Sequence, residues 1–389
     1  MRYMTAILIL GACASGPQGL VNRAVKASGG RKALEAVHGY HIEKDGTWQG
    51  VPYRALSHLR DRTDWRWDQQ GDEWEMNAWV LGTDEATYTR MGGRTVVPAG
   101  PQRAETVRHK KVETSIYLPD RLLADDVTLQ RADPVRIGKT ECPAAEVRFA
   151  DSEPLIYVFD PYTYRIRQIR FTMLTPDGKR AVPGVMDLAT YEEFLGVWVP
   201  RTMFLTWQDG GQKSTIREEV TKVFWNPTIP AATLAAPQAV APPEIGVKEM
   251  PTTTIAVHTH EGPYEDIDKA IDKVHAWIQA NGGEVTGAAS IIYPEMTFQR
   301  AIIQVPTRLA KAPKGGDVEL KRRRGFQFAY AKYEGTWDGP VMLLGNVTSW
   351  CRTKGYEPSG HARVEYVTVD PETKACVAEV GFPVRPRVK

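Results

Sequence analysis

Glu365 is a carboxylate in segment 363–367, Arg-Val-Glu-Tyr-Val, whose other residues mostly suit burial. A carboxylate held in an apolar cleft either becomes neutral, which raises its pKa, or pairs with a cation. Glu365 is therefore predicted to anchor a ligand ammonium group, or to act as a general base toward water. A salt bridge to Arg363, Arg300 or Lys332 is the competing interpretation.

Aromatic residues in the carboxy-terminal third of the chain are predicted to surround this acid. Each would offer a cation–π face worth about 0.5–2 kcal/mol. The predicted ligand-binding residues are Glu365, Tyr264, Tyr293, Tyr333, Trp337, Trp350 and Tyr366. Tyr264 and Trp337 would flank the two ends of the ligand groove, with hinge packing as their alternative role.

His258 and His260 occupy alternate positions of one predicted strand, so they face the same side. Together with Glu261 they are of the types that bind metal ions, but the spacing supplies no third ligand. The sequence therefore predicts neither a metal site nor a cofactor.

The elements that must position these residues occur twice. One offset of 73 residues carries Gly262 onto Gly335, Trp277 onto Trp350 and Tyr293 onto Tyr366. Each copy has the pattern of a strand, an amphipathic helix and two further strands, which indicates a duplicated supersecondary unit. We expect two βαββ units, side by side about a pseudo-twofold axis, because neither helix can bury its apolar face alone.

Residues 244–389 resemble the GyrI-like family of effector-binding, SOUL-related domains. The resemblance rests on segments 246–251 and 260–264, on Trp277, and on Glu365 shortly before Asp370-Pro371. It implies a groove between the two halves that binds amphipathic, often cationic, small molecules, with a glutamate at its centre. Some members that stand alone are hydrolases. The tyrosine that commonly follows that glutamate by two residues is Val367 here.

Residues 20–230 show the alternation of β-strands. About ten antiparallel strands form a curved half-barrel in this prediction, wrapped around helices. One helical stretch, Val21–Gly39, is broken by Gly29-Gly30, and a second is predicted near Lys111–Ala124. Residues 231–243, which are uncharged and rich in alanine and proline, predict a semi-rigid linker. The predicted fold class is α+β.

This half of the chain resembles the LolA/LolB-like family of outer-membrane lipoprotein carriers. The landmarks are the Gly29-Gly30 break and segments 159–163 and 224–230. The resemblance implies a hydrophobic half-barrel that accepts acyl chains. The tryptophans that would line it are Trp48, Trp65, Trp67, Trp74 and Trp79, and packing of these residues in a core is the alternative.

The composition is that of a folded protein with sizeable cores. The 389 residues are 42% hydrophobic and carry a formal net charge of +2, so no strong field for a polyanion is expected. No nucleic-acid partner is predicted, and the basic run Lys321–Arg324 is interpreted as a solvated loop between the repeats. Cys351 and Cys376 either pair or remain buried thiols.

Residues 1–12 are predicted to be a lipoprotein signal peptide. Arg2 precedes the apolar run Ala6–Leu10, and Gly11-Ala12-Cys13 resembles a lipobox, in a segment far shorter than the ~20 apolar residues of a membrane-spanning helix. Cys13 would carry the lipid. The next two residues lack the aspartate that marks inner-membrane retention, which favours the outer membrane, facing the periplasm. Ordinary secretion to the periplasm and a cytoplasmic protein are the alternatives.

Three functions remain open from the sequence. The first is a lipid-anchored envelope protein whose GyrI-like domain binds an amphipathic small molecule. The carboxylate of Glu365 suggests a cationic head group on that molecule. The second is a hydrolase that uses Glu365, and the third is a lipid or lipoprotein carrier that uses the half-barrel. A binding protein is favoured over an enzyme.

Overall fold

A computed structural model provides the coordinates of the chain. It describes residues 16–387 apart from 49, 73–74, 92–93, 151, 175–180, 210–211, 239–242, 263–265, 295–299, 310, 312–315, 338, 371–372 and 374. The predicted signal peptide with Cys13, and also Trp74 and Tyr264, lie outside the described residues.

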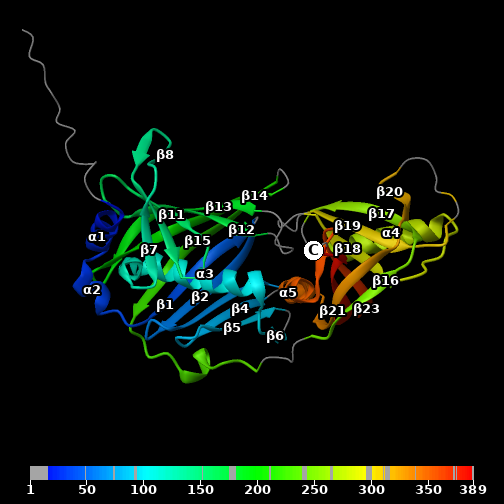
Figure 1. Cartoon of the computed structure of the whole chain (residues 1–389), viewed down its shortest axis with the longest axis horizontal. Coiled ribbons are helices and arrows are strands. Elements are labelled where there is room, and N and C mark those ends of the chain that lie inside the picture. The colour runs from blue at the N-terminus through cyan, green and yellow to red at the C-terminus, as the bar shows by residue number, and fades with distance from the viewer. Residues whose placement is uncertain are drawn as a thin grey trace, which may run out of the picture.

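The amino-terminal half forms one open antiparallel sheet, which within the described residues has 13 strands in the order β6-β5-β4-β3-β2-β1-β15-β14-β13-β12-β11-β10-β7 (Figure 1). Its strands are β1 (Tyr40–Trp48), β2 (Val51–Arg60), β3 (Asp64–Gln70), β4 (Glu75–Leu81), β5 (Ala86–Met91), β6 (Arg94–Val96), β7 (Val127–Arg131), β10 (Ala144–Phe149), β11 (Leu155–Phe159), β12 (Ile166–Leu174), β13 (Ala181–Phe194), β14 (Val197–Asp209) and β15 (Gln212–Trp225). A separate hairpin consists of β8 (Val135–Ile137) and β9 (Thr140–Cys142).

Helices cover one face of this sheet. They are α1 (Pro17–Ala27), α2 (Arg31–Glu35), α3 (Gly100–Tyr117) and the short 3₁₀ turn η1 (Pro119–Leu123). The predicted break at Gly29-Gly30 separates α1 from α2, and both glycines have positive φ. The second helix was predicted too late, near Lys111–Ala124. Polar side chains dominate the first turns of α3, so no apolar stripe marks its start.

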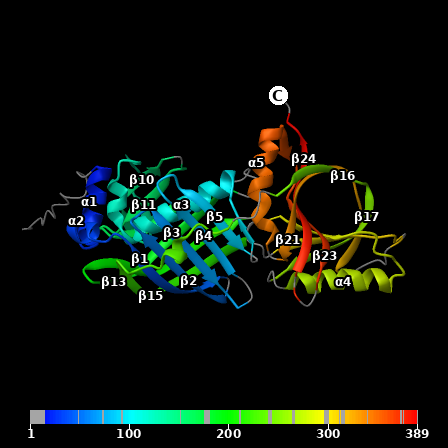
Figure 2. The same ribbon diagram turned by 90° about the horizontal axis from the view of Figure 1, so that it is seen from below.

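The carboxy-terminal half forms a nine-stranded antiparallel sheet, in the order β16-β21-β24-β23-β18-β19-β17-β20 with β22 beside β24. Two helices cover one face of it, and the strands curve away from them (Figure 2). The elements are β16 (Ile245–Met250), β17 (Thr253–Glu261), α4 (Ile267–Ala280), β18 (Ala289–Tyr293), β19 (Arg300–Pro306), β20 (Val318–Arg323), β21 (Phe326–Thr336), the 3₁₀ turn η4 (Pro340–Leu343), α5 (Leu344–Lys354), β22 (Tyr356–Pro358), β23 (Ala362–Val369) and β24 (Ala375–Pro386). The α+β class is thus confirmed.

The two halves of this sheet meet where β18 pairs with β23. The central pair is Ile291 opposite Val364, which are themselves 73 positions apart, so the register is symmetric about that pair. The same offset relates the starts of β16 and β20, of β17 and β21, and of β18 and β23. Each of the two segments related by this offset therefore contains one strand more than the predicted βαββ unit. That extra strand pairs with the other copy, because β16 lies beside β21 and β20 beside β17.

Several smaller expectations can be compared with the structure. The basic run Lys321–Arg324 was predicted as a loop, but its first three residues belong to β20, at the edge of the sheet. Cys351 and Cys376 both lie in the core as thiols, with no disulfide between them in the described coordinates. In the predicted linker, η2 (Ala231–Leu234) packs on β3, where Arg66 donates to the carbonyl of Thr233 at 3.0 Å. None of the described helices is long and apolar enough to span a membrane.

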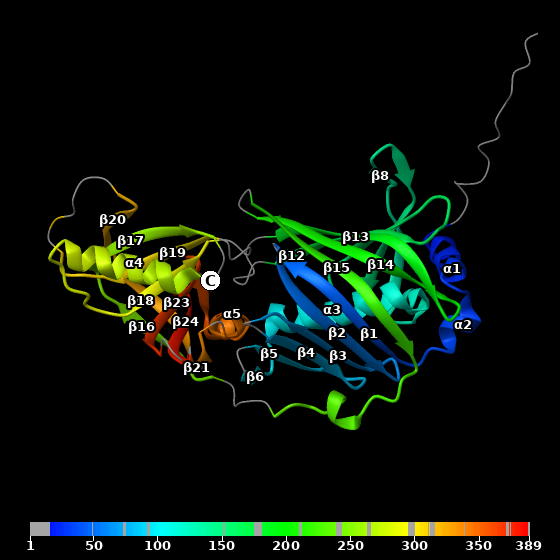
Figure 3. The same ribbon diagram turned by 180° about the vertical axis from the view of Figure 1, so that it is seen from behind.

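The two sheets lie side by side and share a contact through α3 and α5 (Figure 3). Val96 of β6 is buried in the core cluster beneath α5. The side chain of Asn346 donates to the carbonyl of Val97 at 3.4 Å. The carboxy-terminal core thus includes a residue of the amino-terminal sheet.

Gly381 of β24 offers a test of this packing. A Cβ atom there would overlap the carbonyl oxygen of Ala329 on the neighbouring strand. We therefore expect Gly381→Ala to lower the free energy of unfolding by about 1–3 kcal/mol, measured by chemical denaturation. Gly246→Ala is the matched control, because its nearest side-chain atoms are 3.8 Å away. Equal stability of the two variants would contradict this account.

Candidate functional site

Glu365 lies on β23, on the face of the sheet opposite the helices. Successive residues of a strand face opposite sides. Accordingly, Val364 and Tyr366 belong to the core cluster beneath α5, whereas Arg363 and Glu365 face away from it. Both charged side chains are buried, at 5% exposure each, although the described helices α4 and α5 cover the other face. The acid is therefore inside the domain, as predicted.

Glu365 forms an ion pair with its neighbour on the strand. Its Oε1 atom lies 3.0 Å from Nη1 of Arg363, and its Oε2 atom accepts a hydrogen bond of 2.7 Å from Ser290. Nη2 of Arg363 donates to Gln304 at 2.9 Å. Burial lowers the pKa of Arg363, and Glu365 opposes that shift. The structure thus has the salt bridge that the sequence left as the competing interpretation.

A second guanidinium lies beside this pair. Arg323 of β20 and Arg363 both approach the ring of Phe326, with Cζ-to-centroid distances of 5.6 and 5.1 Å. Burial lowers the pKa of Arg323, the charge of Arg363 lowers it further, and Glu365 opposes both effects. We name this group the Arg363 cluster; its members are Ser290, Gln304, Arg323, Phe326, Arg363 and Glu365.

Aromatic residues extend from the cluster along β21. Phe326 contacts Phe328 edge to face, with ring centroids 6.3 Å apart, and Phe328 stacks on Tyr330 at 5.9 Å. Lys248 of β16 lies 5.0 Å from the Tyr330 ring centroid and pairs with Glu379. The face opposite the helices therefore combines charged groups with an aromatic row.

The predicted aromatic residues do not surround Glu365. Those in described positions belong to the other face: Tyr293, Tyr333 and Tyr366 lie in the core beneath α5, and Trp337 and Trp350 pack against it. Tyr366 donates to the carbonyl of Trp337 at 2.7 Å, and Trp350 stacks on Tyr356 with centroids 6.1 Å apart. The acid and these rings therefore lie on opposite faces of the sheet, although Tyr366 is next to Glu365 in the sequence.

His258 and His260 do lie near one hollow, with a volume of about 610 Å³, between β17, α4 and β20. Asp317, Lys273 and Lys321 also line it. The ring of His258 is hydrogen-bonded through Nδ1 to the carbonyl of Asp317 at 2.9 Å. Across the described residues, no group of three or more His, Cys, Asp or Glu side chains is arranged to hold a metal ion.

The interior of the half-barrel is filled by α3. Trp65 and Trp67 are buried in this core, and His109 of α3 packs edge to face against both rings. Trp79 faces the other side of the sheet, beneath Arg66. Trp65 and Trp67 therefore pack in the core, which was the alternative interpretation of these tryptophans.

A buried ion network joins α3 to the sheet. Glu113 of α3 accepts hydrogen bonds from Lys44 at 2.8 Å, Ser57 at 2.5 Å and Trp65 at 2.7 Å. Glu218 lies 3.0 Å from the same Lys44 amino group. Burial raises the pKa of Glu113, but the charges of Lys44 and His109 and the hydrogen bonds from Lys44 and Ser57 together lower it to about 2.

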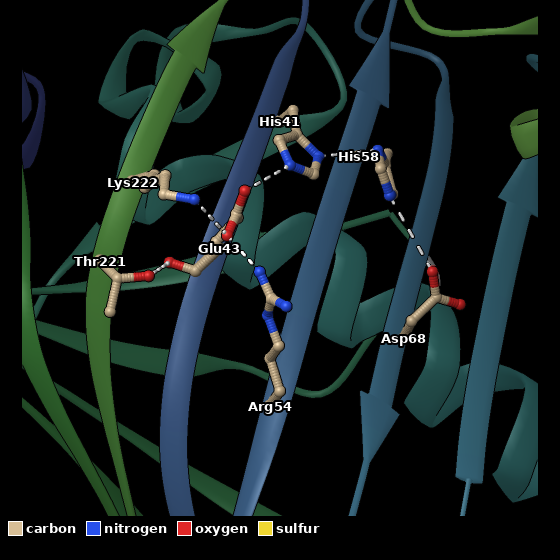
Figure 4. A network of polar contacts seen from close by, with 7 residues as sticks. All are labelled: His41, Glu43, Arg54, His58, Asp68, Thr221 and Lys222. Carbon is tan, nitrogen blue, oxygen red and sulfur yellow. Dashed lines mark hydrogen bonds and ion pairs between the residues drawn. The ribbon is translucent and has the colours of Figure 1, made fainter.

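The outer face of the half-barrel carries a second polar network (Figure 4). Nδ1 atoms of His41 and His58 are 3.1 Å apart, and their Nε2 atoms face Glu43 at 3.5 Å and Asp68 at 3.9 Å. Arg54 and Lys222 pair with the same Glu43. Burial, followed by the charges of His41 and Arg66, lowers the pKa of His58 to about 4. His58 is therefore neutral at physiological pH.

The family model of the GyrI-like small molecule binding domain matches residues 192–297. The match begins in β13, crosses the end of the amino-terminal sheet and includes β16 to β18 of the carboxy-terminal sheet. The resemblance of the carboxy-terminal domain to the GyrI-like family is confirmed up to residue 297. No curated protein sequence matches the chain.

Solved structures with a likeness to this chain fall into two groups. EcmrR in a complex with DNA is 14% identical, with a TM-score of 0.35 over 38% of this chain and 59% of that chain. The carboxy-terminal domain of EcmrR is 16% identical, with a TM-score of 0.34 over 38% and 99%. A LolA-superfamily protein from Nitrosomonas europaea is 10% identical, with a TM-score of 0.39 over 57% and 99%. Similarity at these TM-scores assigns no function.

The charge on Glu113 makes a pH-dependent prediction. Its folded pKa of about 2 lies below the ordinary value of 4.5, so its stabilising effect is complete above pH 4.5 and is lost as the pH falls toward 2. The full effect corresponds to about 3 kcal/mol, at 1.36 kcal/mol for each pH unit. The difference in unfolding free energy between the wild type and Glu113→Gln should therefore shrink below about pH 4.5. Glu105→Gln, on an exposed side chain of the same helix, should show no such trend.

Proposed function

We propose that residues 244–389 form a small-molecule-binding domain, and that its ligand is amphipathic and lies on the face opposite α4 and α5. The supporting observation is the Arg363 cluster, where buried charges adjoin a row of aromatic rings without a covering helix. Polar groups that fix orientation beside apolar surface are typical of ligand sites. The GyrI-like match to residues 192–297 supports the same function.

The same proposal includes the origin of the site. We infer that the domain arose by duplication of a five-element unit, since the register is symmetric about Ile291 and Val364 and the extra strands exchange between copies. Duplication explains why Ser290 and Glu365 lie opposite each other on the two central strands, β18 and β23. The two repeats nevertheless differ at this place. Ser290 and Arg363 occupy equivalent positions, one with a hydroxyl group and the other with a guanidinium group.

The other two functions are less well supported. A hydrolase would need the Glu365 carboxylate free to accept a proton from water, whereas both of its oxygens are engaged by Arg363 and Ser290. A carrier that stores acyl chains in the half-barrel would need α3 to leave the sheet and expose the Lys44–Glu113 pair. Product analysis by mass spectrometry after incubation with esters or amides would separate turnover from binding.

We further propose that the protein is anchored in the cell envelope through a lipid on Cys13, at the outer membrane. The support is the lipobox-like Gly11-Ala12-Cys13 after a short apolar run. Two or more acyl chains are needed for stable anchoring, and lipoproteins carry that number.

The binding site is tested by removing an aromatic contact. Phe326→Ala in the full chain should weaken binding of dodecyl amphiphiles about tenfold, whatever their head group, because the tail loses a ring worth about 1.4 kcal/mol. Isothermal titration below the micellar concentration measures the affinity. Phe224→Ala, which removes a ring that is 47% exposed at the end of β15, is the control. Unchanged affinity in Phe326→Ala would place the ligand elsewhere.

Lipidation is tested independently of the ligand. Expression of the full gene in a Gram-negative host should give a mature protein with acylated Cys13 at its amino terminus and in the membrane fraction. The variant Cys13→Ser should lose both the added mass and the membrane association. A mature terminus at any other residue would refute the proposal.

A further inference from the structure

The charges of the Arg363 cluster do not balance. Among the described residues, two guanidinium groups, Arg323 and Arg363, lie near one carboxylate, Glu365, and only Arg363 is paired with it. The nearby Lys248 and Glu379 neutralise each other. The cluster therefore carries an excess of one positive charge, in surroundings where burial makes charge costly.

Hydrogen-bond donors of the cluster are also unsatisfied. Nε and Nη1 of Arg323, and Nε of Arg363, are shielded from solvent and have no hydrogen-bond partner among the described residues. The side chain of Arg363 is buried, with an exposed fraction of 5%. A buried donor without an acceptor costs about 1–3 kcal/mol. An acceptor brought by a ligand would remove that cost.

The ligand that fits these donors is an anion. We propose that Arg323 and Arg363 form an anion subsite, and that the amphiphile carries an acidic head group such as a carboxylate, sulfate or phosphate. This inference rests on the proposed function and specifies its ligand class. The planar fork of a guanidinium matches such oxyanions, and the charged hydrogen bonds are about twice as strong as neutral ones.

A cationic head group, which Glu365 alone suggested, fits less well. It would have to displace Arg363 from the carboxylate while both guanidinium groups remained nearby. An anion instead leaves the Arg363–Glu365 pair in place and supplies the missing charge to Arg323.

Glycines rather than larger residues flank the aromatic row of β21 beside the subsite. Gly381 is opposite Arg363 on one side and Tyr330 on the other, and Gly246 is opposite Tyr330 on the next strand. These two glycines place no side chain over the aromatic row of β21. A tail that starts at Arg323 and Phe326 would therefore cross toward Tyr330.

The test compares dodecyl ligands that differ in the head group: laurate, dodecanol and dodecyltrimethylammonium, titrated into the tag-free full chain at pH 8. The variant is Arg323→Gln, which removes the unpaired cation and leaves the ion pair intact. Arg322→Gln is the matched control, because Arg322 is the next residue on β20 and is exposed. Thermal melting of each variant checks folding.

Laurate should bind the wild type more tightly than dodecyltrimethylammonium. Arg323→Gln should weaken laurate at least tenfold while dodecanol changes less than about twofold, and Arg322→Gln should change neither. Glu365→Gln should strengthen laurate, because it removes the negative charge. Tighter binding of the cation, or equal laurate affinity in the two arginine variants, would overturn the anion subsite.

The outcomes also separate this inference from the proposed function. If Phe326→Ala weakens every dodecyl ligand but Arg323→Gln does not discriminate, the binding site stands and the anion subsite is wrong. If none of the three ligands binds, or Phe326→Ala changes nothing, both proposals are wrong.

Discussion

The pairing of β18 with β23 is the constraint on which the carboxy-terminal domain depends. Because side chains alternate along a strand, a register that buries Val364 and Tyr366 beneath α5 must turn Arg363 and Glu365 to the opposite face. Ser290 is then directly opposite Glu365 and supplies its hydrogen bond. A shift of one residue would place two charges in the apolar core, so the same interaction that closes the sheet also fixes the site.

The sequence predicted the elements of this domain and the burial of Glu365, because the 73-residue offset and the alternation of strands are local signals. Of the two partners of Glu365, it named Arg363 as the competing salt bridge but did not name Ser290. Ser290 reaches Glu365, and Gln304 and Phe326 reach Arg363, from strands that are distant in the sequence, which no local pattern reports. One signal was present: symmetric pairing of the repeats about Ile291 would have placed Ser290 beside Glu365. Arg323 was missed because it lies in the basic run Lys321–Arg324, which was interpreted as a solvated loop.

The amino-terminal half shows why a tryptophan-rich sheet need not enclose a cavity. The half-barrel was predicted from its alternating strands, but the polar helix α3 left no apolar pattern in the sequence. Lys44 and Glu113 are buried together in this core, and their mutual charge keeps both ionised. Separating them would expose the apolar face of the sheet and leave two charges unpaired, which is costly. Removal of either partner alone would likewise leave one uncompensated buried charge.

Helix α5 packs between α3 and the carboxy-terminal sheet. At its contact with α3, a Cβ atom on Gly100 would overlap the hydroxyl of Ser349, and one on Gly345 would lie 2.8 Å from Cβ of Gln102. The two helices are therefore in close contact, with no room for an added methyl group at either glycine. Val364 and Tyr366 pack beneath α5, while their neighbour Glu365 belongs to the Arg363 cluster. The contact between α3 and α5 is therefore tightly packed, and α3 is in turn joined to its own sheet through Glu113.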